Sequence, residues 1–285
     1  MGFRRTVTVA NINGVAAASR ATIDLPVDRR YHMVLLKYTE SGVLVTQANM
    51  EAALTNIRVN LDARTQREFS AAQLNVLNAS NGAQWAFRNG YLPIYFSEPW
   101  QRTPGDEDIA SWALQGNVAT FQIEIDIAAG RVNPKLEVSA LIDNARMPSG
   151  AKLPLGPIVK TRRLQIPVTA VGVRTVMELP RASGDYLALH CFETAANDIS
   201  KILISVDQNT AFERDRTTNT ALLQNAGFVP AATVFDAIFD ETRRMADGLP
   251  MTRGDNSQVG EFRLDFTMAV ANSFTIVAEL IGKPD

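Results

Sequence analysis

The chain has 285 residues, of which 46% are hydrophobic and 20% are charged, proportions typical of a water-soluble globular protein. Its formal net charge of −2 gives no general attraction for nucleic acid, so direct binding to a genome is not expected. The single cysteine, Cys191, excludes an internal disulfide and suits a reducing cytoplasm, and no apolar run has the length of a membrane-spanning helix or a signal-peptide core.

Strand patterns dominate the chain. Apolar and polar residues alternate over 57–62, 121–127 and 262–268, and this period of two places one face of each strand in a core and the other face outward. Segments 33–38 and 187–192 are apolar on both faces, which predicts strands that are covered on both sides.

Helix patterns are few and short. Ser70 and Gln73 have the spacing of a capping box ahead of Leu74 and Leu77, which predicts a helix that begins there. Residues 106–115 begin with three acidic side chains and end before Gly116, which is also typical of a helix.

The second half of the chain repeats the motifs of the first half in the same order. A repeat of this length indicates two copies of a whole domain. The matching pairs are Asn56–Asp62 with Lys201–Asp207, Ile23–Pro26 before Tyr31 with Met177–Pro180 before Tyr186, Phe121–Ala128 with Phe262–Ala269, and Leu136–Ile142 with Phe274–Ile281.

The repeat also decides one ambiguous segment. Residues 234–245 look helical when they are considered alone, but their partner in the first half, Pro93–Trp100, contains two prolines. Proline is disfavoured in a helix interior, so we predict a strand for the first part of 234–245.

A connector separates the two halves. Residues 147–157 contain three prolines and two glycines, a composition typical of a loop. We therefore predict a first domain over 1–146, a connector over 147–160 and a second domain over 161–285. Each half holds about seven or eight short strands, so we predict an all-β fold of two tandem eight-stranded jelly-roll β-sandwiches with a few short helices in loops.

An ordered series of segments connects the chain to a known family. From about residue 8 to the end, the chain resembles the major capsid protein of the corticovirus group, which are tailless icosahedral bacteriophages with an internal membrane. The loops around 41–52, 97–110 and 143–157 are longer than that pattern. The segments that carry the resemblance are Ile23–Pro26 before Tyr31, Asn56–Arg64, Phe121–Ala129 before Pro134–Leu136, and Glu178–Arg181 before Gly184 and Tyr186.

The resemblance implies a non-enzymatic major capsid protein with two upright jelly rolls, assembled as a homotrimer that forms a pseudo-hexameric capsomer. It further implies contacts with neighbouring capsomers, with the internal viral membrane and with minor membrane or vertex proteins. The protein would then be part of the virion shell, assembled in the bacterial host's cytoplasm. Apart from the resemblance, two similar domains in one chain give a trimer an approximate sixfold symmetry.

Two groups of charged residues are candidates for binding. Asp106, Glu107 and Asp108 can supply oxygen ligands to a structural Ca²⁺, although carboxylates are also favoured at a solvated helix N-terminus. Arg4 and Arg5 can face the anionic headgroups of a membrane beneath the shell.

No cofactor is expected, and no catalytic residue is predicted. His190 and Cys191 are adjacent, but neighbours on a strand point to opposite faces and cannot act together as a base and a nucleophile. Two alternatives remain open. A non-catalytic carbohydrate-binding or receptor-binding double sandwich would bind its ligand without forming shells, whereas a double jelly-roll hydrolase would need acidic or histidine groups that converge in one cleft.

Overall fold

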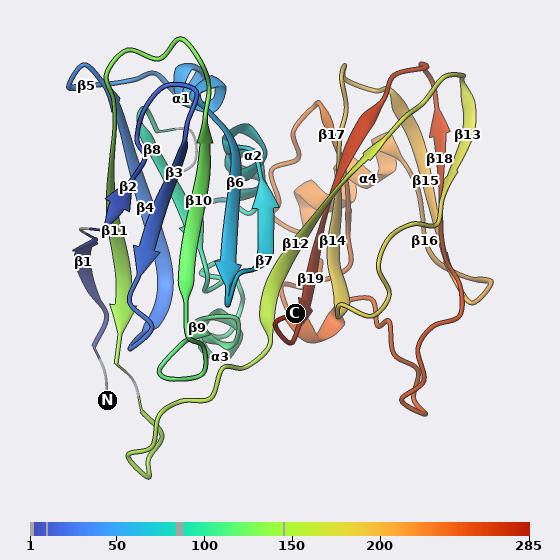
Figure 1. Ribbon diagram of the computed structural model, residues 1–285. Coiled ribbons are helices and arrows are strands. Elements are labelled where there is room, and N and C mark those ends of the chain that lie inside the picture. The colour runs from blue at the N-terminus through green and yellow to red at the C-terminus, as the bar shows by residue number, and fades with distance from the viewer. Residues whose placement is uncertain (1–2, 10, 84–87, 145) are drawn as a thin grey trace. The chain divides into compact units, whose positions relative to one another are not determined.

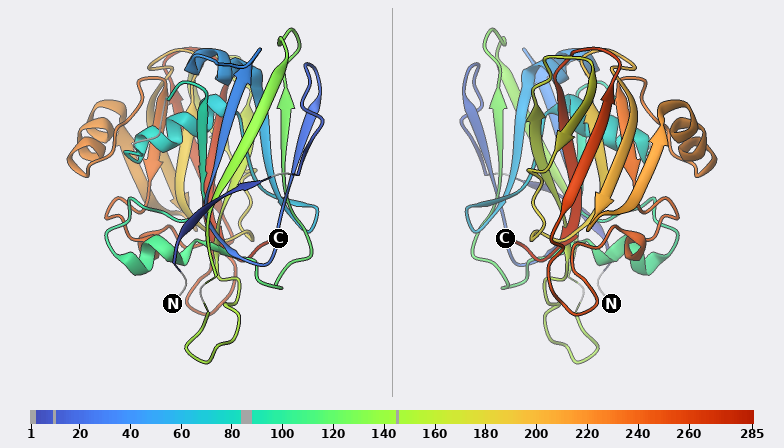
Figure 2. Two further views of the ribbon diagram at one scale, coloured as in Figure 1. Left: turned by 90° about the vertical axis from the view of Figure 1, so that its left-hand side faces the viewer. Right: turned by 90° about the vertical axis from the view of Figure 1, so that its right-hand side faces the viewer.

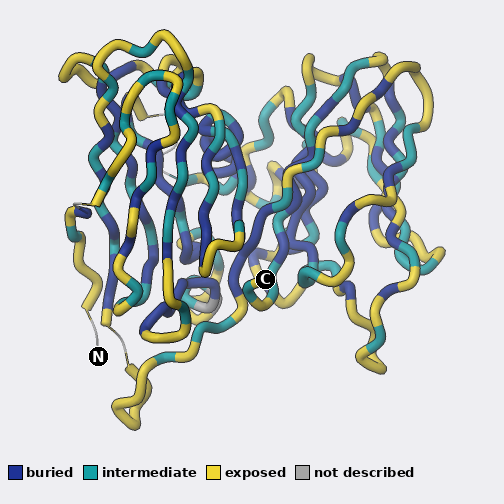
Figure 3. The backbone as a smooth tube through the Cα atoms, in the orientation of Figure 1, coloured by how far each residue is buried: buried dark blue, intermediate teal, exposed yellow. Residues whose placement is uncertain are grey.

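The computed structural model describes residues 3–9, 11–83, 88–144 and 146–285, with the backbone only at Pro104, Asp106 and Ile109. The chain divides into two compact units. The first unit contains Met1–Val159 and Pro284–Asp285, and the second contains Lys160–Lys283. Each is a β-sandwich with its own hydrophobic core (Figures 1 and 3).

The first unit is built from two antiparallel sheets. One has the order β1-β11-β4-β5, and β4 also pairs with β8 and β9; the other has the order β2-β3-β10-β6-β7. The strands of the first sheet are β1 (Arg5–Val9), β4 (Arg30–Glu40), β5 (Val43–Leu44), β8 (Tyr91–Tyr95), β9 (Trp112–Ala113) and β11 (Pro134–Asp143). Those of the second are β2 (Ile12–Asn13), β3 (Arg20–Leu25), β6 (Leu54–Leu61), β7 (Arg64–Phe69) and β10 (Phe121–Ile127).

The helices in the described loops of the first unit are α1 (Gln47–Ala53), α2 (Ala71–Ser80) and α3 (Pro104–Ile109). Figure 2 shows α1 and α3 at opposite ends of the sandwich. The predicted capping box of α2 is confirmed, because the N–H of Gln73 donates to Ser70 Oγ at 3.2 Å and the N–H of Ser70 donates to Gln73 Oε1 at 2.9 Å.

The helix predicted over 106–115 is correct only in its first part. The chain leaves the helix after Ile109, and β9 then pairs with the start of β4 through Tyr31 and Trp112. Trp112 is fully buried beside Phe96 and Phe121. Burial of this large aromatic ring outweighs the weak helix preference of the segment.

The second unit repeats the arrangement of the first. Its sheets have the orders β12-β19-β14-β17 and β13-β18-β15-β16, which match β1-β11-β4-β8 and β3-β10-β6-β7 strand for strand. The elements are β12 (Ile158–Ile166), β13 (Gly172–Val176), β14 (Asp185–Phe192), β15 (Ile199–Val206), β16 (Asn209–Asp215), α4 (Arg216–Asn225), β17 (Val234–Ile238), the 3-10 helix Met245–Asp247, β18 (Phe262–Met268) and β19 (Phe274–Gly282).

The architecture confirms the predicted fold of two tandem jelly rolls. Strand β17 is entirely buried and pairs with β14, which confirms the strand that the repeat predicted at the start of 234–245. No helix in the described part of the chain is long and apolar enough to span a bilayer.

The repeated aspartates have the same role in both units. Asp62 and Asp207 follow β6 and β15 in hairpin turns, with φ angles of 48° and 47°. Asp62 Oδ1 accepts main-chain hydrogen bonds from Ala119 and Thr120 at 2.7 and 2.9 Å, and Asp207 Oδ1 accepts the equivalent pair at 2.9 and 3.0 Å. Aspartate tolerates a left-handed backbone better than most residues, so one side chain both forms the turn and holds the neighbouring loop.

The repeated tyrosines are also equivalent. The hydroxyl of Tyr31 donates to the carbonyl of Pro26, and that of Tyr186 donates to the carbonyl of Pro180, in each case at 2.6 Å. Both tyrosines are almost completely buried, and burial raises the pKa of each phenol above its ordinary value. The hydroxyls therefore stay protonated as hydrogen-bond donors.

We predict that Tyr31→Phe and Tyr186→Phe each destabilise the protein by about 1 kcal/mol, because the hydrogen bond between a buried tyrosine hydroxyl and a proline carbonyl is lost. Urea denaturation followed by fluorescence measures the change. Tyr95→Phe is the control, since no hydrogen bond of the Tyr95 hydroxyl is found among the described residues. Equal midpoints for all three variants and the wild type would contradict a stabilising role for these hydroxyls.

Candidate functional site

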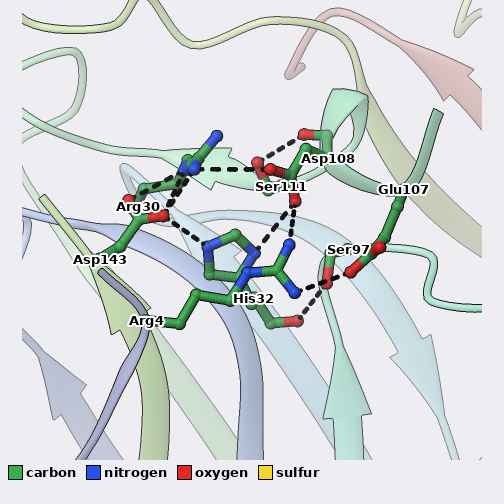
Figure 4. Close-up of polar contacts among 8 residues, drawn as sticks. All are labelled: Arg4, Arg30, His32, Ser97, Glu107, Asp108, Ser111 and Asp143. Carbon is green, nitrogen blue, oxygen red and sulfur yellow. Dashed lines mark hydrogen bonds and ion pairs between the residues drawn. The ribbon is translucent and has the colours of Figure 1, made fainter. Parts of the chain in front are cut away.

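A cluster of charged side chains lies at the end of the first unit where the N-terminal segment meets α3 and the start of β4 (Figure 4). We call it the Arg4 cluster. Its members are Arg4, Arg30, His32, Glu107, Asp108 and Asp143, with Ser97 and Ser111 at its border.

The buried part of the Arg4 cluster is held by pairing between β4 and β11. Asp143 is paired in register with Arg30. Arg30 donates to both carboxylate oxygens of Asp143, from Nη2 at 2.5 Å and from Nε at 3.0 Å. The register shifts between Leu141, which is opposite Met33, and Ile142, which is opposite Tyr31, so His32 has no residue opposite it on β11. Its Nε2 lies 2.9 Å from Asp143 Oδ2. A bulge of this kind redirects a side chain, and here it brings a histidine to the carboxylate.

The outer part of the Arg4 cluster connects the N-terminal segment to α3. Arg4 forms ion pairs with Glu107 at 2.7 Å and Asp108 at 2.6 Å. Asp108 in turn lies 3.5 Å from both His32 Nδ1 and Arg30 Nη2. Burial lowers the pKa of Arg4, but its hydrogen bonds to these carboxylates and their charges outweigh that effect, so the pKa of the guanidinium is raised.

Two sets of residues that the sequence suggested for different roles therefore meet in one place. Arg4, a candidate for the membrane, binds Glu107 and Asp108, two of the three candidates for Ca²⁺. The side chain of Asp106, the third, lies outside the described residues. Arg5 is exposed at the start of β1. Among the side chains that the structure describes, no group of three or more His, Cys, Asp or Glu residues can hold a metal ion.

A second buried charge cluster lies in the second unit and was not predicted. His190 Nδ1 is 2.7 Å from Asp236 Oδ1, and His190 Nε2 is 3.5 Å from Glu279 Oε2. The three residues come from the adjacent strands β14, β17 and β19. We call this the His190 cluster. It could not be found from sequence because its members are far apart in the chain, and their contact depends on strand register.

The His190 cluster favours a charged imidazole. Burial lowers the pKa of His190, but hydrogen bonds and charges from Asp236 and Glu279 raise it more strongly, to about 10. Its neighbour Cys191 is fully buried in the core, and burial raises the pKa of that thiol well above its ordinary value. A thiol in this state is a poor nucleophile.

Both clusters join structural elements. The Arg4 cluster connects β4, β11, α3 and the N-terminal segment, and the His190 cluster joins three neighbouring strands of one sheet. Breaking a buried ion pair by removing one partner is strongly destabilising, because the remaining charge stays buried. The arrangement of charges therefore favours a structural role for both sites.

Comparison with protein families matches nearly the whole chain. The model of the viral coat protein P2 N-terminal domain matches residues 6–143, and that of the viral coat protein P2 C-terminal domain matches residues 158–284. No curated protein sequence matches the chain.

Solved viral capsid structures share the fold. The major capsid protein P2 from bacteriophage PM2 has a TM-score of 0.84 at 18% identity, with 99% of this chain and 98% of that chain covered. The STIV MCP has a TM-score of 0.69 at 9% identity, with 98% and 97% covered. The PBCV-1 virus capsid has a TM-score of 0.66 at 11% identity, with 99% and 94% covered.

The raised pKa of His190 predicts a pH dependence of stability. A histidine whose pKa is higher in the folded state stabilises the fold fully below its unfolded pKa of about 6.5, and this contribution disappears as the pH rises toward about 10. We expect the melting temperature of the wild type to fall more steeply between pH 6.5 and 10 than that of His190→Gln. Parallel curves for the two proteins would contradict the charged state of His190.

Proposed function

The chain belongs to the viral coat protein P2 family, and from this premise we propose that it is the major capsid protein of an icosahedral bacteriophage with an internal membrane. As a viral coat protein it is a component of the virion shell. Its building block is a homotrimer that forms a pseudo-hexameric capsomer, assembled in the cytoplasm of the bacterial host.

One observation supports the proposed trimer. The two units of the chain have the same strand order in both of their sheets. Three copies of the chain therefore supply six similar sandwiches, which approximate a hexagon while the ring closes with true threefold symmetry. Hexagonal blocks can pack side by side in a shell, and neighbouring capsomers are then the first partners of each trimer.

Exposed apolar residues support contact with other proteins of the shell. Val43 and Val132 are 68% and 60% exposed, and the loops that carry them are joined by a hydrogen bond from Ser41 N to Asn133 O. Burial of apolar surface stabilises by about 25 cal/mol per Å² before the entropic cost of association. This patch suits contacts to neighbouring capsomers or to minor vertex proteins.

Arg5 is the better of the two candidates for contact with the internal membrane. The charge of Arg4 is largely neutralised by Glu107 and Asp108, whereas Arg5 is exposed at the same end of the first unit. A basic residue near an anionic lipid surface contributes about 1 kcal/mol. No observation on the described residues favours the alternative of a carbohydrate-binding or receptor-binding module.

The trimer predicts a definite mass. Light scattering of the purified protein should give a species near three times 31.2 kDa. If a structural Ca²⁺ binds at subunit contacts, EDTA should dissociate this species, and added Ca²⁺ should restore it. A monomer at all concentrations, with and without Ca²⁺, would contradict the proposed capsomer.

The membrane contact predicts different effects for the two arginines. Arg5→Ser should weaken binding to vesicles that contain anionic lipid about fivefold, which corresponds to about 1 kcal/mol. Arg4→Ser should have a smaller effect because its charge is already paired. Co-sedimentation with anionic and neutral vesicles measures both. Equal binding by the wild type and Arg5→Ser would remove Arg5 as a lipid contact.

A further inference from the structure

One edge of the second unit is open. Strand β13 pairs with β18 on one side and ends its sheet on the other (Figure 1). Across the described parts of the chain, no main-chain hydrogen bond reaches residues 172–176 from that outer side. Edge strands with unpaired N–H and C=O groups are able to accept a further strand.

The equivalent edge of the first unit is covered by the chain itself. There β3 takes the place of β13, and the short strand β2 pairs with it through Ile12–Ile23 and Asn13–Thr22. Ile12 also packs against the core of the first unit. In the second unit the segment between β12 and β13 forms no such strand. The first unit thus shows which kind of structure fits this edge, namely a short extended segment with an apolar side chain.

Apolar side chains line the open edge on its outer face. Val171, Val173 and Met177 are 66%, 68% and 55% exposed, and they occupy alternate positions on the strand and its extensions, so they point to the same side. Their neighbour in the sheet, β18, presents polar residues there, with Thr267 opposite Val173 and Asp265 opposite Thr175. Figure 3 shows this border of the unit as exposed.

The Nε group of an arginine on the inner face of the same strand has no hydrogen-bond acceptor among the described residues. Arg174 lies on the same side of β13 as the core residue Val176 and is paired in register with Phe266. Its Nε is buried. Buried N–H groups in folded proteins nearly always have an acceptor, and an incoming segment can supply one as a carboxylate or a carbonyl oxygen.

We propose that the open edge of β13 binds an extended segment of a second copy of this chain by strand addition. The added strand pairs with the free main-chain groups, covers the row from Val171 to Met177 and provides an oxygen acceptor for Arg174. The proposal rests on the proposed function, because in a capsid shell the neighbours of each chain are further copies of it. Since only one of the two units has this edge open, the contact is directional, as a closed ring of three requires.

Two separate lysine substitutions test the proposal. Val173→Lys and, separately, Met177→Lys place a charge in the proposed interface and should weaken assembly at least about tenfold, as a buried unpaired charge does. Val229→Lys is the control, because Val229 is 59% exposed in the same unit and follows Phe228, which packs in a cluster with Leu223 of α4 and Ile238 of β17. Light scattering over a concentration series measures assembly, and circular dichroism establishes that each variant is folded.

Hydrogen exchange of the wild type gives an independent measurement. The main-chain amides of 172–176 that point away from β18 should become protected on assembly, and those of a dissociated sample should exchange rapidly. Normal assembly of Val173→Lys and Met177→Lys would contradict strand addition at β13, and so would an assembled wild type without this protection. Neither result would contradict the capsomer. A wild type that never assembles would instead contradict the capsomer, and with it the occupant named here.

Discussion

The structure of this protein depends most on how the main-chain groups at the edges of its β-sheets are paired or covered. Main-chain N–H and C=O groups inside a sheet have partners, whereas those at an edge must be covered, protected or paired with another chain. In the first unit, β2 extends the sheet beyond β3, and the N-terminal strand β1 pairs with β11. In the second unit, β13 ends its sheet without such a strand. Two sandwiches with the same topology therefore have different edges at this position.

Buried ion pairs join neighbouring strands in one sheet of each unit. Arg30, His32 and Asp143 join β4 to β11, and His190 joins β14 to β17 through Asp236. A one-residue slip in strand register would separate each pair and leave buried charges without partners, at a high energetic cost. The two units fix their strand register with different charged residues, whereas the aspartate turns and the tyrosine hydrogen bonds occur in both. The two units are thus more alike in local turn chemistry than in long-range charge pairing.

Much of the fold was predictable because its signals are local or repeated. Alternation predicted β10 and β18, the capping box predicted α2, and the repeat correctly assigned β17 against its own helical pattern. The site was less accessible to prediction. Arg4 meets Glu107 across about one hundred residues of sequence, and His32 reaches Asp143 only because a bulge redirects it. Contacts of this kind leave no periodic pattern, and β2 is too short to show one. The end of α3 was misplaced because burial of Trp112 overrides local preference.

Electron microscopy of the purified protein tests the central claim most directly, since it images the arrangement of the sandwiches. Averaged projections down the symmetry axis of the assembled particle should show six similar lobes with threefold symmetry, because each chain contributes two β-sandwiches of the same strand order. Averages that show only separate two-lobed particles, or a ring whose lobes are not a multiple of six, would contradict the capsomer.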